Sequence, residues 1–273
     1  MKNPLISVIV PTRNSERTLE SCLRSIRNQS YSPVEILVVD NQSSDKTCAI
    51  AEKFADVVLE KGPERSAQRN YGAKHSRGEY LLFVDSDMVL TPQVVSEAYE
   101  SILKNTSDGV IIPEDSIGIG FWAQCKALER SFYVGIDWME AARFFTKKSF
   151  LAMNGYDENN TGTEDYDLPQ RMVAAGYQLS RIQSLIHHNE GNLSLIGTMK
   201  KKYYYAQRLN AYQSTEANKD SFALQASPLQ RYILFFSRPR KIIQQPVLFI
   251  GMVIMKTAEF AAGGVGYIYS HVK

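Results

Sequence analysis

Short apolar runs alternate with segments of helical periodicity over the first 112 residues of the chain. The clearest run, residues 80–84, is unbroken and ends at Asp85, which is typical of a strand buried on both faces. Between such runs, apolar residues recur at i, i+3, i+4 and i+7, the spacing of a helix that packs one face on a core. The pattern predicts strands at 5–10, 35–39, 57–59, 80–84 and 109–112, and helices at 19–26, 44–54, 65–76 and 94–102.

This alternation predicts an α/β fold. Repeated βα units build a doubly wound sheet with right-handed crossovers and helices on both faces. After residue 112 the expected elements are less regular: a helix at 121–133, a strand at 142–145, and a helix that starts near Tyr166 and stops at Gly176. We therefore predict one domain over residues 1–198 and a separate helical segment over residues 199–273.

Composition narrows the functional classes. The chain has 273 residues, of which 44% are apolar, so it can build a full core. Its formal net charge of +2 implies no strong polyanionic partner, and we expect no nucleic acid partner. The three scattered cysteines indicate a reducing compartment, and the first strand begins too early to leave room for a cleavable signal peptide. A cytoplasmic location is therefore expected.

Two carboxylates, Asp85 and Asp87, follow the most apolar strand. In an open α/β sheet, the ligand crevice lies outside the carboxyl ends of such strands. Two acids in that position can hold a hard divalent cation, which in turn binds a phosphate-bearing substrate. The alternative is an ordinary Asp/Ser turn that ends the strand.

Five motifs in order carry a family resemblance. They are SVIVPTRN (7–14), VVDNQSSD (38–45), Arg69-Asn70 with Gly72, Asp85-Ser86-Asp87, and Thr163-Glu164-Asp165. Together they resemble the family 2 inverting glycosyltransferases over about residues 4–200. The resemblance implies a GT-A (Rossmann-like) fold, a doubly wound mixed sheet flanked by helices. It also implies metal-dependent sugar transfer from a nucleotide sugar to a hydroxyl acceptor.

Residues after the first two strands are candidates for binding the nucleotide. Pro11, Thr12 and Arg13 follow the first strand and are expected to line the crevice. Asp40 follows the second strand, where a carboxylate can accept hydrogen bonds from a uracil N–H or a ribose hydroxyl. The alternative for Asp40 is a turn or helix-capping acid.

Other candidates concern the diphosphate. Arg65 and Arg69 lie one helical turn apart, so one of them could meet the diphosphate or the base; the alternative is a solvated basic face. The resemblance implies that Asp85 contacts the ribose, and Ser86 belongs to the same donor-binding motif. It further implies that Asp87 ligates Mg²⁺ or Mn²⁺, which would neutralise the charge on the leaving nucleoside diphosphate.

The second acidic pair is the candidate catalytic centre. Inverting transfer needs one base for the acceptor hydroxyl, and the resemblance assigns this role to Asp165, with Glu164 orienting the acceptor. The alternative is that both acids stabilise the N-terminus of the following helix. The resemblance also implies a histidine metal ligand at His187 or His188. Adjacent strand residues point to opposite faces, so only one can face the site, and we favour His187 without excluding His188.

The C-terminal segment combines basic, aromatic and apolar residues. Two apolar stretches, 246–255 and 260–269, are separated by Lys256 and Glu259, and each is shorter than the roughly 20 residues of a membrane-spanning helix. With the basic clusters at 200–202 and 238–241, these stretches predict helices that lie on the cytoplasmic face of a membrane. The alternatives are a helical lid and a dimer contact.

The expected activity does not identify a single donor or acceptor. The donor is a UDP-, GDP- or dTDP-sugar, with UDP favoured by the resemblance, and the acceptor is a glycan or a lipid-linked acceptor. One rival is a polyprenyl-phosphate glycosyltransferase, whose ionised acceptor would not need Asp165 as a base. Another is a non-catalytic nucleotide-sugar-binding protein. A nucleotidyltransferase is disfavoured, because no glycine-rich basic loop follows the first strand.

Overall fold

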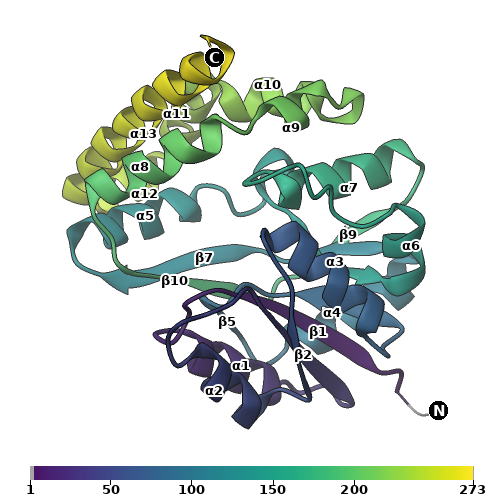
Figure 1. Ribbon diagram of the computed structural model, residues 1–273. Helices are drawn as coiled ribbons and strands as arrows, with labels where there is room; N and C mark the ends of the chain where they lie inside the picture. The colour runs from purple at the N-terminus through teal and green to yellow at the C-terminus, as the bar shows by residue number, and fades with distance from the viewer. Residues whose placement is uncertain (1–2, 273) are drawn as a thin grey trace.

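The computed structural model describes residues 3–272 and is built around a seven-stranded mixed sheet (Figure 1). All strands of this sheet run parallel except β8, which is antiparallel to both of its neighbours. The order across the sheet is β3 (Val57–Glu60), β2 (Val34–Asp40), β1 (Ile6–Thr12), β4 (Tyr80–Phe83), β8 (Ala142–Thr146), β6 (Gly109–Ile111) and β9 (Leu179–Arg181). The expected α/β class and mixed sheet are thus confirmed.

Side chains of the central strands alternate between two apolar cores, one on each face of the sheet. On β1, Val8 and Val10 pack towards one face while Ile9 packs towards the other, as the period of a strand requires. The first face is covered by α1 (Leu19–Arg27), α2 (Thr47–Phe54) and α4 (Val94–Asn105). The second is covered by α3 (Arg65–His75), α6 (Lys147–Ala152) and α7 (Glu164–Ala174).

Gly72 allows α3 to lie close to the sheet. A Cβ atom at this position would stand 2.6 Å from Cγ2 of Ile9 and 3.1 Å from Cγ2 of Val39. Any larger residue would therefore push α3 away from β1 and β2. The short spacing between helix and sheet carries the arginines of α3 towards the carboxyl ends of the strands.

A second, three-stranded sheet was not foreseen from the sequence. Its order is β5 (Met88–Leu90), β10 (Ile186–Asn192) and β7 (Glu114–Ile119), with β10 antiparallel to β5 and parallel to β7. β5 begins one residue after Asp87, so the sheet fixes the backbone on the far side of the acidic motif. β5 has only three residues and β10 is mostly polar, so neither strand leaves a hydrophobic pattern long enough to detect.

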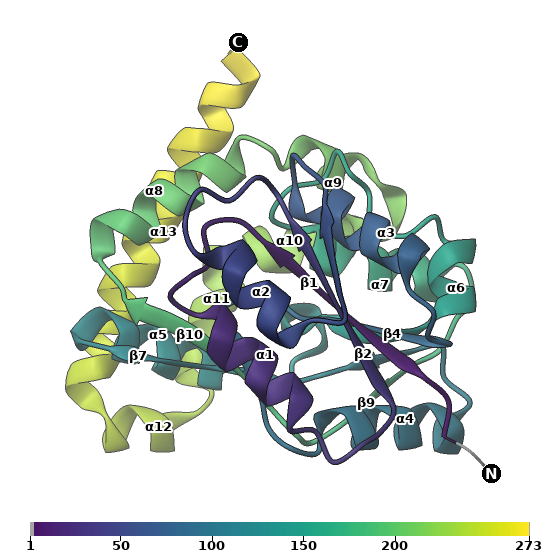
Figure 2. The ribbon, with the colours of Figure 1, turned by 60° about the horizontal axis from the view of Figure 1, so that its bottom comes forward.

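Two helices from the C-terminal part of the chain, α8 (Leu195–Ala206) and α13 (Pro246–Val272), pack side by side, and α13 also packs on α5 (Phe121–Ser131), next to the small sheet (Figures 1 and 2). A third apolar core joins Cys125 and Phe132 to Phe235, Phe249 and Met252. The other C-terminal elements are α9 (Asn210–Ser214), η2 (Glu216–Asn218), α10 (Lys219–Ala226), α11 (Pro228–Phe236) and α12 (Pro239–Gln244). Of these, η2 lies against α7, and α10 lies against η1 (Asp137–Met139), the short helix that follows α5. The domain boundary after residue 198 stays a prediction.

The expectation of two short apolar segments in the tail is wrong. α13 runs without interruption from Pro246 to Val272. Lys256 and Glu259, which were expected to separate the segments, are 5% and 3% exposed, because they form ion pairs with Lys126 and Glu129 of α5. Charges that meet partners inside the protein do not interrupt a helix.

The start of α7 also differs from the expectation. The helix begins at Glu164, two residues before Tyr166, so Pro169 lies inside it rather than in its first turn. Proline has no N–H, so the carbonyl of Asp165 receives no i+4 hydrogen bond from residue 169. The first turn of α7, which carries both candidate catalytic acids, is therefore tied less firmly to the rest of the helix.

Candidate active site

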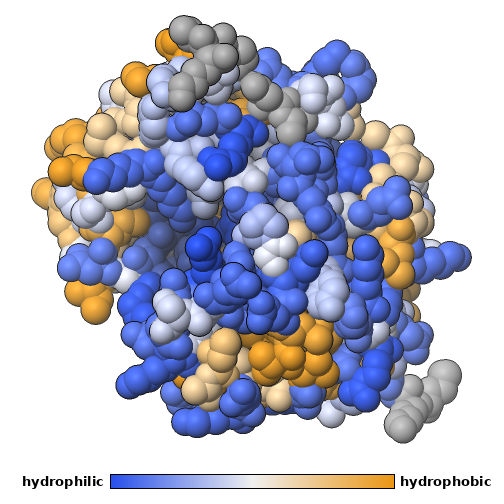
Figure 3. Space-filling view, in the orientation of Figure 1, coloured by the Kyte–Doolittle hydropathy of each residue, from blue (hydrophilic) through white to orange (hydrophobic). Residues whose placement is uncertain are grey.

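A cavity of about 1050 Å³ opens beside the carboxyl ends of the central strands and extends to the C-terminal helices. In Figure 3 it corresponds to the hollow lined by hydrophilic side chains, to the right of the apolar edge. Asp85, Asp87, Asp165 and His188 line it on the sheet side. The structure thus brings together acidic residues that stand about 80 positions apart in the sequence.

Pro11, Thr12, Arg13 and Asp40, which were expected at the nucleotide, lie at the ends of β1 and β2 and do not line this cavity. Thr12 and Asp40 are register partners, and the Thr12 hydroxyl donates to Asp40 over 2.8 Å. Asp40 also accepts from the Ser43 amide at 2.7 Å and the Ser43 hydroxyl at 2.6 Å. This is the turn-stabilising geometry that we considered as the alternative, and it uses most of the acceptor capacity of Asp40. Pro11 is buried and Arg13 is exposed.

Arg69 is not on a solvated face. Its side chain is fully buried and donates to Asp85 at 2.5 Å and to Asp165 at 2.7 Å. It therefore links the end of β4 to the start of α7, and the alternative of a solvated basic face is wrong for this residue. Arg65 is half-exposed at the cavity wall, with Nη2 2.9 Å from Glu164 and Nη1 4.0 Å from Asp85.

Asp85 is surrounded by three guanidinium groups. Burial alone would raise the pKa of this carboxyl, but Arg69, Arg143 and Arg65 outweigh it and hold the pKa well below its usual range. Asp85 is therefore a permanent anion at neutral pH. Ser86, next to it, shares a hydroxyl hydrogen bond of 2.8 Å with Ser15 on the first loop.

The two acids of the second motif have different surroundings. Asp165 lines the cavity, and its side chain is 18% exposed. Glu164 has a side chain only 2% exposed; it accepts a hydrogen bond from the Gly162 amide at 2.5 Å and forms an ion pair with Arg65, whose Nη2 lies 2.9 Å away. The expectation that Glu164 orients the acceptor finds no support in this geometry, because its carboxylate is turned into the protein. Glu164 instead fixes the turn that presents Asp165.

Of the two histidines, His188 and not the favoured His187 approaches the acidic motif. His188 Nε2 lies 3.5 Å from Asp87 Oδ1, whereas His187 Nδ1 lies 2.6 Å from Asp115 on the neighbouring strand. The reason is register: His188 pairs with Met88, directly after Asp87, and adjacent strand residues alternate between faces. The preference for His187 is therefore corrected.

Asp87 and His188 suit an Mg²⁺ or Mn²⁺ ion that is completed by substrate. Two adjacent ligands of an octahedral ion of this size lie about 3 Å apart, close to the observed 3.5 Å. Among residues 3–272, no group of three or more His, Cys, Asp or Glu side chains is arranged to hold a metal. Phosphate oxygens and water would supply the remaining ligands, as is usual for Mg²⁺.

Sequence reasoning missed several charged residues of the cavity, of which Arg143 of β8, Glu114, Arg130 and Glu190 form one connected group. Glu114 accepts from Arg143 Nε and, at 2.7 Å, from Arg130. Glu190 lies 3.5 Å from both Arg130 and His188. Burial would raise the pKa of Glu114, but Arg143 and Arg130 lower it to about 2. A detectable signal existed only for Arg143, a lone charge inside the apolar strand 142–145.

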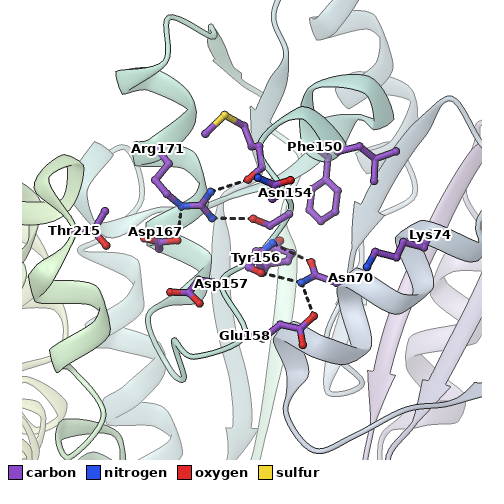
Figure 4. A pocket seen from close by; sticks show the side chains of 13 residues that line it. Asn70, Lys74, Phe150, Asn154, Tyr156, Asp157, Glu158, Asp167, Arg171 and Thr215 are labelled. Atoms are coloured by element: carbon purple, nitrogen blue, oxygen red, sulfur yellow. Dashed lines mark hydrogen bonds and ion pairs between the residues drawn. The ribbon is translucent and has the colours of Figure 1, made fainter.

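A smaller cavity of about 540 Å³ lies behind the loop that leads to the second acidic motif (Figure 4). The Asn70 side chain accepts the Tyr156 amide at 2.9 Å and donates to the Tyr156 carbonyl at 2.8 Å. Arg171 donates to Asp167 and to the carbonyls of Met153 and Gly155. These contacts explain the Arg69-Asn70 pair: one residue holds the two acids, and the other anchors the approach to the second motif.

The far wall of the large cavity carries a buried ion-pair cluster between α5 and α13. Lys126 Nζ lies 2.7 Å from Glu129 and 2.8 Å from Glu259, and Lys256 Nζ lies 2.5 Å from Glu129 and 2.6 Å from Glu259. Lys202 of α8 also faces this cavity. The sequence led us to expect the basic cluster at 200–202 on the outer, membrane-facing surface. Lys202 faces the cavity instead.

The mixed sheet, with an acidic motif at the end of β4 and a second acid at the start of α7, defines a protein of the GT-A fold. The sequence profile described as Glycosyl transferase family 2 matches residues 7–155, more than half of the chain. The chain belongs to glycosyltransferase family 2.

Curated relatives match part of the chain. Glycosyltransferase EpsJ of Bacillus subtilis, described as uncharacterized, is 33% identical over 150 residues, which are 53% of this chain and 41% of EpsJ. The poly(ribitol-phosphate) beta-N-acetylglucosaminyltransferase TarS of Staphylococcus aureus is 35% identical over 117 residues, 39% of this chain and 20% of TarS. These matches span less than half the length of either relative.

Solved structures share the fold. The mannosyltransferase PcManGT from Pyrobaculum calidifontis, in complex with GDP-Man and Mn²⁺, superposes with a TM-score of 0.65 at 16% identity, covering 98% of this chain and 88% of that one. S. aureus TarS 1–349 in complex with UDP-GlcNAc gives a TM-score of 0.55 at 19% identity, covering 97% and 88%. At such identities the likeness establishes the GT-A fold alone.

Proposed function

We propose that the protein transfers a sugar, with inversion, from a nucleoside diphosphate sugar to a hydroxyl group of an acceptor. The observation that carries the proposal is the shared cavity of Asp87, His188 and Asp165. Inverting transfer needs a site for the leaving diphosphate on one side of the sugar and a base on the other. Residues 1–198 would supply both, and residues 199–273 would form the acceptor side.

The leaving-group side of the proposed site is built from Asp85, Asp87 and His188. Asp87 and His188 would hold Mn²⁺ or Mg²⁺, which neutralises the negative charge that develops on the leaving diphosphate. Asp85, kept ionised by its arginine neighbours, would accept hydrogen bonds from the ribose hydroxyls. Half-exposed Arg65 can reach the diphosphate by turning away from Glu164. Pro11, Thr12, Arg13, Asp40 and Ser86 would border the nucleotide.

Asp165 is the proposed general base. Its carboxylate faces the cavity and is oriented by Arg69, with Arg143 Nη2 at 3.6 Å. An acceptor hydroxyl entering from the side of the C-terminal helices would give its proton to Asp165 as the oxygen attacks the anomeric carbon. The neighbouring guanidinium groups fix the direction of the carboxylate, which is what a positioned base requires.

A panel of UDP-, GDP- and dTDP-sugars with Mn²⁺ tests this proposal. TarS has been solved with UDP-GlcNAc and PcManGT with GDP-Man, so both nucleotide classes belong in the panel. At least one donor should stabilise the protein against heat and release its nucleoside diphosphate. Asp165→Asn should lower turnover by about 10²–10⁴-fold and leave donor affinity nearly unchanged.

Asp157→Asn is the matched control for the base. Asp157 lies on the same approach loop, its carboxylate accepts from Asn159 alone among the described residues, and it lines the smaller cavity instead of the large one. Turnover in Asp157→Asn should stay within about twofold of the wild type. If Asp165→Asn is equally active, the polyprenyl-phosphate alternative gains. If no nucleotide sugar binds, the glycosyltransferase proposal fails; if one binds without ever being cleaved, a non-catalytic binding protein is favoured.

We also propose that the C-terminal helices rest on the cytoplasmic face of a membrane and that the acceptor is carried on a lipid. In the part of the chain that the structure describes, α13 is long and apolar enough over Pro246–Ser270 to cross a bilayer, by length and composition alone. One of its faces carries Lys256 and Glu259 into the protein, whereas Val247, Ile250 and Ile254 are 50–67% exposed. A helix with one anchored and one apolar face suits a peripheral location.

One relative is consistent with this choice of acceptor. The GalNAc(5)-diNAcBac-PP-undecaprenol beta-1,3-glucosyltransferase of Campylobacter jejuni is 30% identical over 116 residues, 39% of this chain and 36% of that protein. Its name describes a lipid-linked acceptor. The large cavity extends from Asp165 to α13, so an acceptor held at the membrane-facing helices could reach the proposed base.

A further inference from the structure

Arg143 is the buried group of the cavity that no motif accounts for. It lies on β8, is 4% exposed and lines the cavity. Its three nitrogens have different surroundings. Nε donates to Glu114, Nη2 lies 3.6 Å from Asp165, and Nη1 has no hydrogen-bond partner, with Asp85 Oδ2 at 3.8 Å.

An unpartnered nitrogen on a buried guanidinium needs an explanation. Buried polar groups in folded proteins almost always find a partner, since an unmet donor loses its hydrogen bonds to water without replacement. Nη1 belongs to a residue that lines a cavity large enough for a substrate. Nη1 itself exposes less than 1 Å² of surface, so a small rotation of the guanidinium towards this cavity would bring it to an oxygen atom of a bound ligand.

The surrounding charges limit what that oxygen can belong to. The fork of Arg143 spans the gap between Asp85 and Asp165. A phosphate oxygen is anionic and only accepts hydrogen bonds, so two carboxylates beside it would repel it. A sugar hydroxyl both donates and accepts, so it can accept from Nη1 and donate to a carboxylate at the same time.

We propose that Arg143 is a specificity-determining residue that binds one hydroxyl of the sugar being transferred. This inference rests on the proposed function, in which the sugar lies between the diphosphate beside Asp87 and the base Asp165. Arg143 would then read one hydroxyl of that sugar while its Nε remains anchored to Glu114. Donors that lack this hydroxyl, or carry it in the other configuration, would be poor substrates.

The test is a double-mutant cycle between Arg143 and the donor. The wild type and Arg143→Lys are each assayed with the preferred nucleotide sugar and with analogues that lack one hydroxyl at a time. In the wild type, one deoxy analogue should lower kcat/KM by about 10- to 100-fold, the range for a hydrogen bond to a charged group. In Arg143→Lys that same loss should shrink to below about threefold, while the losses for the other hydroxyls stay unchanged.

Arg130→Lys is the matched control, because Arg130 also lines the cavity and also donates to Glu114, over 2.7 Å. This variant should retain the full penalty for the deoxy analogue. Binding of the nucleoside diphosphate alone, with Mn²⁺, should be the same in Arg143→Lys and the wild type. Each comparison uses two ligands on one variant, so partial unfolding cancels; if Arg143→Lys does not fold, Arg143→Gln replaces it, because it keeps an N–H donor.

Two outcomes overturn the inference. Equal penalties for every hydroxyl in the wild type and in Arg143→Lys would show that Arg143 reads none of them. A matching loss of affinity for the nucleoside diphosphate would mean that Arg143 serves the diphosphate. Both outcomes leave the glycosyltransferase activity of the wild type intact. A wild type that turns over no nucleotide sugar would instead overturn the proposed function, and this inference with it.

Discussion

Arg69 shows how one residue can hold two candidate catalytic groups. Asp85 follows a strand and Asp165 starts a helix, and both contact the same buried guanidinium at 2.5 and 2.7 Å. Removing one partner from a buried ion pair costs far more than the pair contributes, because the other charge is left uncompensated. The relative position of the two acids is therefore fixed by the fold, before any substrate arrives.

The adjacent histidines allow a matched test of the metal site. His188→Ala should weaken Mn²⁺-supported donor binding by about tenfold or more, since it removes one of two proposed protein ligands. His187→Ala should leave it nearly unchanged, because His187 is bonded to Asp115 and points away from Asp87. Calorimetric titration of nucleoside diphosphate with Mn²⁺ into each variant measures this. Equal losses in both variants would contradict the assignment of His188.

Glu114 makes the free energy of unfolding of the protein depend on pH. Its pKa is lowered from 4.5 to about 2 in the folded protein, so the stabilisation is fully present above about pH 4.5 and is lost as pH falls towards 2. Its maximum size is about 3 kcal/mol. Relative to Glu114→Gln, which does not titrate, the wild type should lose its advantage in free energy of unfolding as pH falls from about 5 to about 2. Urea unfolding of both proteins across this range tests it, and a constant difference would be contrary to the argument.

Among individual residues of the site, those in the motifs could be predicted from the sequence, but the residues that contact them could not. Asp85, Asp87 and Asp165 stand at ends of elements that the hydrophobic pattern marks, so their approach to one edge of the sheet followed from topology. The choice between His187 and His188 failed because it depends on a one-residue register between β10 and β5, which an alternating pattern so short does not specify. Glu114 and Arg130 give no signal, since an isolated charge resembles any surface residue.

At the scale of elements, α13 is held by charge as well as by apolar packing. Lys256 and Glu259 are buried against Lys126 and Glu129, beside the core formed by Phe249, Met252 and Met255. The sequence pattern located the apolar stretches correctly but treated the intervening charges as a break. A buried ion pair with a partner more than 100 residues away cannot be recognised from local hydropathy.

Lys256→Met tests that ion-pair cluster. Among the described residues, the substitution leaves Lys126 as the one ion-pair partner of buried Glu129 and Glu259, so it should lower the free energy of unfolding by about 3–5 kcal/mol. Lys200→Met, on exposed α8 surface, should change it by less than about 0.5 kcal/mol. Chemical denaturation of the two variants gives both values. A loss in Lys256→Met no larger than in the control would mean that the cluster does not anchor α13.

At the scale of the whole molecule, the C-terminal helices present an apolar edge beside the mouth of the cavity (Figure 3). Arg238 and Lys241, which were expected to face anionic lipid, instead donate to carbonyls of Ser131 and Val134 at the end of α5. Attraction to a membrane would thus rest more on apolar contact than the sequence indicated. Exposed Arg240 and Lys200 would add a smaller, salt-sensitive contribution.

Vesicle binding separates these contributions. Replacing Ile250 and Ile254 together by Asp should abolish co-sedimentation with anionic vesicles, because both side chains are at least half-exposed on the outer face of α13. Leu103→Asp, at a similarly exposed apolar position on α4, should bind as the wild type does. High salt should weaken binding only partly. If the wild type does not bind vesicles at low salt, α13 is a lid or a dimer contact and the lipid-linked acceptor loses its main support.

The dependence of donor cleavage on Asp87 tests the central claim most directly. Nucleoside diphosphate release from the best donor would be measured for the wild type and for Asp87→Ala, each with Mn²⁺ and with a chelator. We predict release only by the wild type with Mn²⁺, while both proteins unfold at the same temperature, because the half-exposed Asp87 makes no buried ion pair. Release by Asp87→Ala at the wild-type rate would contradict the account.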